Sequence, residues 1–476
     1  MSRRIYALIL LLVLLIPILA ACGQTDQPGG TGAEATQPAG AETPAAAAAT
    51  PTALSEQGET PPPGGGASPF GDLATAGSTG DVTKIQVEDG AELRVATWGD
   101  PSEQEVNQAA FDRFKQLFPN VNIVYQPVPT EFQTTMKADM AGNTEPDVFY
   151  LDTSLMNAFA PNGLLLQLDD YMQQAGVSVD GYIGELAQIF QLDGKTYGLP
   201  KDFGALALFV NTDMAQQAGI DPQNIKTWDD WNNAAQQMTQ GEGNEKVFGQ
   251  CTSHDIQRVA ALWFARGAEI AENNQAAFNT EDVVQATQFW YDMYRNGYAA
   301  LPNEVGADWC GQAFGEGKVA MALEGGWMIP FLRREAPDVN YVAIPIPQPE
   351  GGQQASLVFT NAWAASARTQ YPNAAAALVL FLTSAANQKP IMETGFALPT
   401  VTALLDDPYF EQHPNERVIA EAGEYGRVAD LVFTREHKDD VIKSLNTAME
   451  SIWLGQQDIQ PALDQAAQEV TQIVSQ

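Results

Sequence analysis

The pattern of apolar and polar positions after residue 90 alternates between strand-like and helix-like segments. Three short apolar runs have the length of buried strands: 92–98, 121–125 and 147–151. Apolar residues at helical spacing fill the segments between them, over 103–118 and 131–141. This order predicts a parallel sheet covered by helices, and ligands of such sheets bind beyond the carboxyl ends of the strands.

A second α/β unit begins after a turn-rich segment at 194–200. Its predicted strands are 205–210, 247–250, 319–323 and 339–347, and its predicted helices are one opened by Thr227, then 256–266 and 280–296. A second Pro-rich link at 345–352 is followed by a predicted strand at 362–366 and a predicted helix at 373–384. The two links suggest that the chain passes from one lobe to the other and back. Several crossings make a hinge, and a cleft between lobes is the expected ligand site.

The first 22 residues have the character of a secretory signal. Arg3 and Arg4 precede an apolar run at 5–19, which is shorter than the ~20 residues needed to cross a bilayer. The small residues before Cys22 resemble the bacterial lipobox, in which the cysteine receives a diacylglycerol and becomes the new N-terminus. An ordinary signal peptide with an incidental cysteine is the alternative. We expect Cys22 to anchor the protein at the outer face of the cytoplasmic membrane.

The segment after Cys22 is nearly all Gly, Pro, Ala, Thr, Ser, Gln and Glu. Such a composition cannot bury enough apolar surface to offset its ordering entropy, which predicts a disordered tether over 23–88. A flexible chain of roughly 65 residues would hold the folded part about 45 Å from the anchor.

Charge limits the classes of partner. Acidic residues outnumber basic residues 59 to 24, and the formal net charge is −35. This charge repels nucleic acid and anionic lipid, so nucleic acid is not an expected partner, and a strongly anionic ligand would need local compensation. With three histidines and no zinc-type spacing of His and Cys, neither a metal nor another cofactor is expected.

Two cysteines, Cys251 and Cys310, lie beyond the tether. In an oxidising exterior they could pair, and closing a loop of ~60 residues would contribute on the order of 4 kcal/mol in the chain-entropy model. Two unpaired buried thiols are an equal alternative, because sequence spacing does not show whether the Cα atoms approach within ~7 Å.

Several motifs in order along the chain resemble the extracellular solute-binding proteins of carbohydrate ABC importers, the family typified by maltose-binding protein. They are Ala96-Thr97-Trp98-Gly99-Asp100, Pro146-Asp147-Val148 leading to Asp152, Asn162-Gly163-Leu164-Leu165, Gly198-Leu199-Pro200 running into Phe209-Val210-Asn211, Glu316-Gly317-Lys318-Val319-Ala320-Met321, Gly326-Trp327 and Gly395-x-x-x-Pro399. The resemblance covers nearly all of 92–476. Val210 departs from it, because the family usually has a tyrosine before this asparagine.

The resemblance implies a periplasmic-binding-protein-like α/β fold with two lobes, a hinge of three crossings and an interlobe cleft. We assign 89–204 and 348–415 to the N-terminal lobe, and 205–347 and 416–476 to the C-terminal lobe. The resemblance also implies a non-enzymatic protein that captures a di- or oligosaccharide and delivers it to the permease subunits of an ABC importer. We expect it to act as a monomer.

A sugar presents C–H faces and a ring of hydroxyl groups, so its receptor needs flat aromatic rings and oxygen acceptors. Three tryptophans at strand ends or beside glycines are candidate platforms, with Trp327 preferred: Trp98, Trp327 and Trp363. The resemblance places Trp98 and Trp327 near the bound sugar. The candidate polar partners are Asp100, Asp152, Lys201, Asp202 and Asn361, with His254, Asp255 and Asp308 as weaker candidates. Each tryptophan could instead pack in the core, and each aspartate could cap a helix or turn.

Two other functions stay open. The same fold could bind a glycerol phosphodiester, a polyamine or a peptide, although a phosphate would call for cations in the cleft, where Lys201 is the obvious one. A surface-anchored glycosidase needs two carboxylates about 5 to 10 Å apart, which a sequence alone does not exclude. The chain contains no metalloprotease, nucleophile-elbow or phosphate-loop motif.

Overall fold

The computed structural model describes residues 80–475, without 100, 129, 435 and 436. These residues form a mixed α/β fold around a ten-stranded sheet with the order β10-β7-β11-β6-β13-β3-β1-β2, in which β12 also pairs with β6 and β14 with β13. The strands are β1 (Glu92–Ala96), β2 (Asn122–Tyr125), β3 (Val148–Leu151), β6 (Gly198–Asn211), β7 (Gln250–Cys251), β10 (Ala299–Ala300), β11 (Met321–Gly325), β12 (Tyr341–Ile344), β13 (Leu357–Ala365) and β14 (Arg427–Val428). Two short hairpins are β4 (Gln191–Leu192) with β5 (Lys195–Thr196), and β8 (Ala271–Glu272) with β9 (Gln275–Ala276).

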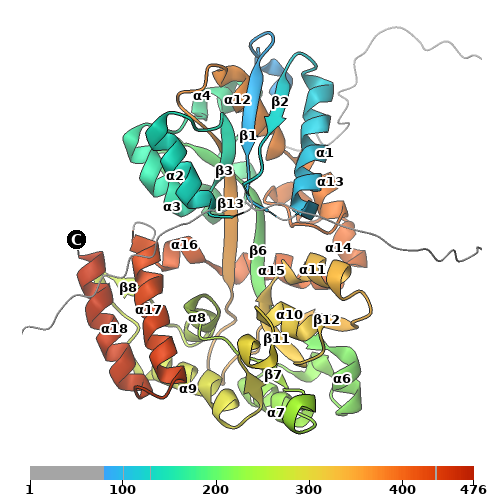
Figure 1. The fold of residues 1–476 in the computed structure, drawn as a ribbon, viewed down its shortest axis with the longest axis vertical. Coiled ribbons are helices and arrows are strands. Elements are labelled where there is room, and N and C mark those ends of the chain that lie inside the picture. Colours follow the sequence, from blue (N-terminus) through green and yellow to red (C-terminus); the bar gives the residue numbers. More distant parts are fainter. Residues whose placement is uncertain (1–79, 100, 129, 435–436, 476) are drawn as a thin grey trace, which may run out of the picture. The chain divides into compact units, whose positions relative to one another are not determined.

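Helices surround this sheet in two groups (Figure 1). The first group is α1 (Pro101–Leu117), α2 (Phe132–Gly142), α3 (Thr153–Phe159), α4 (Asp169–Ala175), α5 (Gly184–Gln188), α12 (Pro372–Leu382) and α13 (Ala385–Glu393). The second group is α6 (Thr212–Gln217), α7 (Trp228–Met238), α8 (Ile256–Ala265), α9 (Glu281–Arg295), α10 (Cys310–Gly315), α11 (Met328–Glu335), α17 (Lys438–Trp453) and α18 (Ile459–Val474). Between them lie α14 (Tyr409–Gln412), α15 (Pro414–Tyr425) and α16 (Ala429–Val432).

The long strands β6 and β13 connect the two groups of elements (Figure 1). They pair antiparallel from Ala205 opposite Val358 to Gly198 opposite Ala364. The chain thus leaves the first group along β6, returns along β13, and passes back through α14 and α15. This is the expected arrangement of two α/β lobes with repeated crossings.

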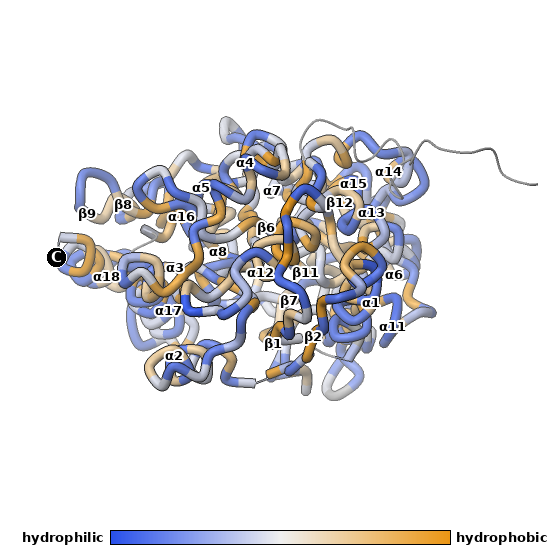
Figure 2. The backbone as a smooth tube through the Cα atoms, turned by 90° about the horizontal axis from the view of Figure 1, so that it is seen from above, coloured by the Kyte–Doolittle hydropathy of each residue, from blue (hydrophilic) through white to orange (hydrophobic). Residues whose placement is uncertain are grey.

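The apolar run in β6 follows from burial on both faces of the sheet. Alternate residues enter different hydrophobic clusters, with Ala205, Ala207 and Phe209 in one and Leu206, Leu208 and Val210 in the other. A strand that is covered on both faces reads as a continuous hydrophobic run instead of an alternating one. Figure 2 shows hydrophobic positions gathered along the inner strands, with more mixed colouring on outer helices such as α1 and α17.

Only some of the strand pairs in the observed sheet are parallel, as predicted, and the others are antiparallel. β1 pairs parallel with β2 and β3, as the strand and helix order predicted. β6 and β13 run antiparallel to each other, β6 also runs antiparallel to β11, and β13 to β3, so the sheet is mixed. Both strands also begin earlier than predicted, at Gly198 and Leu357, because polar residues interrupt the apolar pattern where the two strands cross between lobes.

The described fold begins before residue 89, the predicted start of the N-terminal lobe. A 3₁₀ turn at Val82–Lys84 follows Asp81, whose side chain accepts from the backbone N–H of Thr83. Val82 and Ile85 are buried in the core, and the N–H of Asp81 donates to the carbonyl of Ala175. Residues 82–88 therefore belong to the fold. Cys22 and the rest of the expected signal and tether up to residue 79 lie outside the described residues.

A disulfide joins Cys251 at the end of β7 to Cys310 at the start of α10, with Cα atoms 5.6 Å apart. The pairing hypothesis is confirmed, and the alternative of two free thiols is wrong. Among residues 80–475, no helix combines the length and the apolar character needed to cross a membrane.

Candidate ligand-binding cleft

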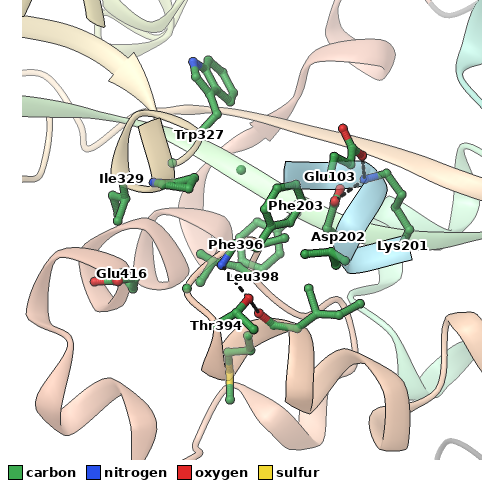
Figure 3. Close-up of a pocket in the computed structure, with 18 of the residues that line it drawn as sticks. Glu103, Lys201, Asp202, Phe203, Trp327, Ile329, Thr394, Phe396, Leu398 and Glu416 are labelled. Atoms are coloured by element: carbon green, nitrogen blue, oxygen red, sulfur yellow. Dashed lines mark hydrogen bonds and ion pairs between the residues drawn. The ribbon is translucent and has the colours of Figure 1, made fainter. Parts of the chain in front are cut away.

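A cavity of about 780 Å³ opens between the two lobes. One wall comes from α1, from α13 and from the segment after α13; the opposite wall comes from α11 and α15; and β6 and β13 lie between them. The lining includes two indoles, Trp98 and Trp327, and five further aromatic rings: Phe203, Phe331, Phe359, Phe396 and Tyr409. Figure 3 shows Phe396 and Leu398 beside Phe203. The size and mainly apolar lining are typical of a site for a small organic ligand.

A cluster of one cation and two anions lies where β6 enters the cavity. The Nζ of Lys201 donates to Oε1 of Glu103 at 3.2 Å and also contacts Oδ2 of Asp202. Figure 3 shows both carboxylates directed at the ammonium group. The three side chains are 10 to 20% exposed, so solvent screens them only in part.

A β-bulge explains how two neighbouring residues point into one cavity. In β6, Pro200 lies opposite Ala362 and Asp202 lies opposite Asn361, which leaves Lys201 as an extra residue without a partner in β13. Side chains of successive strand residues normally point to opposite faces, and an extra residue locally changes this direction. The bulge therefore brings Lys201 and Asp202 together at the point where the chain passes between lobes.

The phenol of Tyr150 contacts two members of this cluster, Glu103 and Lys201. Its hydroxyl donates to Glu103 at 2.9 Å and accepts from the Nδ2 of Asn107 at 2.8 Å, while the Lys201 ammonium lies 4.6 Å from its ring centroid. Burial raises the pKa of Tyr150 well above its usual value, so the hydroxyl keeps its proton. Burial alone would lower the pKa of Lys201, but the charges of Asp202 and Glu103 outweigh it and raise that pKa well above its usual value.

Trp327 lies half-buried at the wall of the cavity and is held in place by its neighbours. Its indole N–H donates to Oε2 of Glu324 at 3.2 Å, and the guanidinium of Arg258 lies 5.3 Å from its ring centroid. The Arg258 group also binds Glu324 at 3.0 Å. A Cβ at Gly325 would lie 2.2 Å from the indole, so the glycine is needed at this position. A ring fixed in this way can present a flat apolar surface at low entropic cost.

Arg333 of α11 links the two walls of the cavity. Its Nη1 donates to the carbonyl of Thr394 beyond α13, and its Nη2 donates to Oε1 of Glu416 in α15, both at 2.9 Å. A Cβ at Gly395 would lie 1.8 Å from Nη1, so the guanidinium fits only against a glycine. The contact joins segments that lie on opposite walls of the cavity.

Five of the eight predicted site residues line this cavity: Trp98, Lys201, Asp202, Trp327 and Asn361. Trp98 is half-buried and packs edge-on against Phe132 and Tyr150. Asp100 lies outside the described residues. The two remaining candidates, Asp152 and Trp363, have structural roles.

Asp152 caps a helix instead of facing the cavity. Its Oδ1 accepts from the backbone N–H of Leu155 at 2.8 Å at the start of α3, and its Oδ2 accepts from Gln133 at 2.9 Å. The chain turns from β3 directly into α3, whose first N–H groups need an acceptor. Asp152 therefore lies outside the cavity lining, and its carboxylate serves as a helix cap.

Trp363 is a core residue. It is 3% exposed and packs edge-on against Tyr150 and Phe111, with ring centroids at 4.4 and 6.2 Å. It lies two residues beyond Asn361 on the same face of β13, and this spacing places it about 6 to 7 Å deeper in the first lobe. The weaker candidates also lie outside the cavity lining, and Asp255 caps α8 through the N–H of Gln257.

Sequence reasoning missed several lining residues, including Glu103, Phe203, Arg333, Phe396 and Glu416. Glu103 lies in the first turn of α1, where an acidic residue reads as a helix-stabilising charge. Phe203 is adjacent to Asp202, and this proximity was the one available signal. Among the described residues, no group of His, Cys, Asp and Glu side chains could hold a metal ion.

Removal of the Asp152 cap should affect stability without affecting ligand binding. We expect Asp152→Ala to lower the free energy of unfolding by about 1 kcal/mol, because the first turn of α3 loses its acceptor. Asp152→Asn keeps an acceptor and is the matched control. Urea denaturation measures the change in the free energy of unfolding. Titration with a sugar that binds the wild type should give the same affinity for wild type, Asp152→Ala and Asp152→Asn. A loss of affinity without a loss of stability would restore Asp152 to the site.

Comparisons with known proteins agree with this geometry. The family model for bacterial extracellular solute-binding proteins matches residues 109–417. The galactooligosaccharide-binding protein of Bacillus subtilis is 23% identical over 368 residues, which cover 76% of this chain and 84% of that protein.

Among solved structures, an ABC substrate-binding protein of Listeria monocytogenes in complex with cycloalternan has a TM-score of 0.73 at 19% identity, covering 81% of this chain and 100% of that one. UgpB of Mycobacterium tuberculosis, in complex with glycerophosphocholine, has a TM-score of 0.70 at 19% identity, covering 80% of this chain and 98% of that one. Both similarities confirm the periplasmic-binding-protein-like fold. The family match over 109–417 shows that the chain belongs to the bacterial extracellular solute-binding proteins.

Proposed function

We propose that this protein captures a di- or oligosaccharide in the cavity between its lobes and delivers it to the transmembrane subunits of an ABC importer. The observation that carries the proposal is one cavity that combines aromatic rings with fixed oxygen acceptors. Trp98 and Trp327 offer indole faces to the C–H surface of a sugar ring, and Asp202, Glu103 and Asn361 offer acceptors to its hydroxyl groups.

The relatives support this class of ligand. The B. subtilis relative is named for galactooligosaccharides, and the L. monocytogenes structure contains cycloalternan. A volume of about 780 Å³ leaves room for more than one sugar ring. A glycerol phosphodiester is the second candidate, favoured by the likeness to UgpB. A polyamine, a peptide or a surface glycosidase has no comparable support here, and we propose no catalytic step.

We further propose the organisation that brings cargo to the membrane. Cys22 carries the lipid anchor, the tether ends before Val82, and the protein acts as a monomer outside the cytoplasmic membrane. The N-terminal lobe comprises 89–204 and 348–415, together with the preceding residues 82–88, and the C-terminal lobe comprises 205–347 and 416–476. Motion of the lobes about β6, β13 and the α14–α15 segment would close the cavity on its ligand.

Loss of the Trp327 indole should weaken sugar binding. A thermal-shift screen of neutral di- and trisaccharides on the purified protein would identify a ligand, and calorimetry would then give its affinity. We expect Trp327→Ala to lower this affinity by about 5- to 150-fold, the equivalent of roughly 1 to 3 kcal/mol, because one stacking surface is lost. Trp327→Phe keeps a ring and should lose less. Equal affinity of wild type and Trp327→Ala would exclude this platform.

Ligand should shift the protein toward a more compact form, because only a closed cavity contacts the sugar from both walls. Small-angle X-ray scattering at saturating ligand should give a smaller radius of gyration than the free protein. A sugar that the screen shows not to bind, at the same concentration, controls for changes in solvent contrast. Superimposable curves with and without ligand would contradict closure.

Cys22 should be the site of lipid attachment. We expect cells that produce the wild-type protein to incorporate labelled palmitate into it, and Cys22→Ser to abolish the label and release the protein from the membrane fraction. The double variant Cys251→Ser and Cys310→Ser is the matched control, and it should stay labelled. Label that persists in Cys22→Ser would show another anchor.

A further inference from the structure

The cations that line the cavity are already engaged by oxygen acceptors of the protein. Within the described part of the chain they are Arg113, Lys201, Arg333 and Arg334. Arg113 donates twice to Oδ1 of Asn387, at 3.2 and 2.7 Å. Arg333 holds Glu416 and the Thr394 carbonyl, and Arg334 binds Glu335 at 2.7 Å. Three of these four cations thus face a carboxylate of the protein, whereas the Asn387 partner of Arg113 is neutral and supplies only a hydrogen-bond acceptor.

Lys201 is the most strongly compensated of the four. Its side chain is 10% exposed, and it lies between Glu103 and Asp202, whose side chains are 14 and 20% exposed. One positive charge thus faces two negative charges. The pairing is also built into the backbone, because the bulge in β6 directs Lys201 and Asp202 to the same place.

We infer that the Lys201, Glu103 and Asp202 cluster is a charge filter that admits neutral sugars and rejects uronic acids, sugar phosphates and phosphodiesters. This inference rests on the proposed function and specifies its substrate class. The ammonium pre-organises two carboxylates, whose remaining lone pairs accept from neutral hydroxyl groups. An anionic ligand would have to displace a carboxylate from Lys201, and it would leave that carboxylate unpaired in a partly desolvated site.

Neutralisation of the two carboxylates should allow anionic ligands to bind more tightly in the cavity. The double variant Glu103→Gln and Asp202→Asn keeps the shape of both side chains and the acceptor oxygens, but it leaves Lys201 without a countercharge. Glu105→Gln is the matched control, because Glu105 lines the same cavity from α1, is exposed, and is not among the carboxylates that contact Lys201. It removes one negative charge from the cavity while the cluster stays intact.

The first measurement uses calorimetry to compare two α-1,4-linked ligands that differ only at C6, galactotriose and trigalacturonate, and it also includes glycerophosphocholine. The neutral panel of the thermal-shift screen accompanies galactotriose, so that another sugar can serve as the neutral reference. We expect wild type and Glu105→Gln to bind a neutral sugar and to bind trigalacturonate at least tenfold more weakly. The double variant should bind trigalacturonate about tenfold or more tightly than wild type, because a free ammonium can then pair with a carboxylate.

The second measurement uses inorganic phosphate and needs no knowledge of the sugar. Phosphate stabilises most proteins slightly by exclusion from their surface, so the change in melting temperature is compared among the three proteins at equal ionic strength. We expect a larger increase for the double variant than for wild type and Glu105→Gln. Unliganded melting curves of all three proteins verify that each is folded.

The possible failures are distinguishable. If wild type binds trigalacturonate as tightly as the neutral sugar, or if phosphate stabilises wild type as much as the double variant, the filter is wrong while sugar capture stands. If Glu105→Gln gains anion binding equal to that of the double variant, overall charge and not the Lys201 cluster is responsible, which also overturns the filter. If wild type binds glycerophosphocholine and no sugar, both the filter and the proposed function are wrong.

Discussion

The pairing of β6 with β13 is the constraint on which the rest of the structure depends. These strands contact each other from Ala205 and Val358 to Gly198 and Ala364, and both lobes are built outward from them. In the second lobe β6 is covered on both faces and is apolar, whereas at the crossing it carries Lys201 and Asp202. Buried polar groups need partners, so the crossing is the one part of the strand pair where a polar ligand could replace solvent without disturbing a core.

The same crossing accounts for the geometry of both sides of the cavity. The bulge at Lys201 directs a cation and an anion toward α1, where Glu103 completes the cluster. At Gly204, a Cβ would lie 3.3 Å from the Trp327 ring, so the absence of a side chain in β6 lets the indole approach the strand. A tightly packed interior transmits such local choices into fixed side-chain positions. The polar cluster and the indole are thus placed by neighbouring residues of one strand.

The sequence allowed the prediction of the fold and of a small part of the cavity lining. Trp98, Trp327, Lys201, Asp202 and Asn361 could be found because they follow strand ends, glycines or a presumed crossing. The role of a side chain at a strand end was less predictable. Trp98 and Asp152 both follow a strand, β1 and β3, but α3 begins at once after Asp152 and takes its carboxylate as a cap.

The other differences between the predicted and the observed site come from contacts between residues that are far apart in the sequence. Glu103 and Lys201 are far apart along the chain, and only the fold shows that a helix-start carboxylate meets a strand lysine. Trp363 lies on the same face as Asn361, but the depth at which the lobe closes over β13 cannot be read from alternation alone. The bulge leaves no trace in the apolar pattern either, because both Lys201 and Asp202 are polar.

The large negative charge of the chain and the charges inside the cavity act at different distances. A net charge of −35 lowers the concentration of anions near the protein, but salt screens it over about 8 Å at physiological ionic strength. It therefore affects the rate at which charged molecules arrive more than their affinity once inside. Discrimination between a neutral sugar and its acidic counterpart must therefore come from contacts shorter than this screening length. Among the ion pairs of the described cavity, the one between Lys201 and its two carboxylates is the least exposed to solvent. Surface charge and the ion cluster are in this respect separate properties, and substitutions in one should leave the other unchanged.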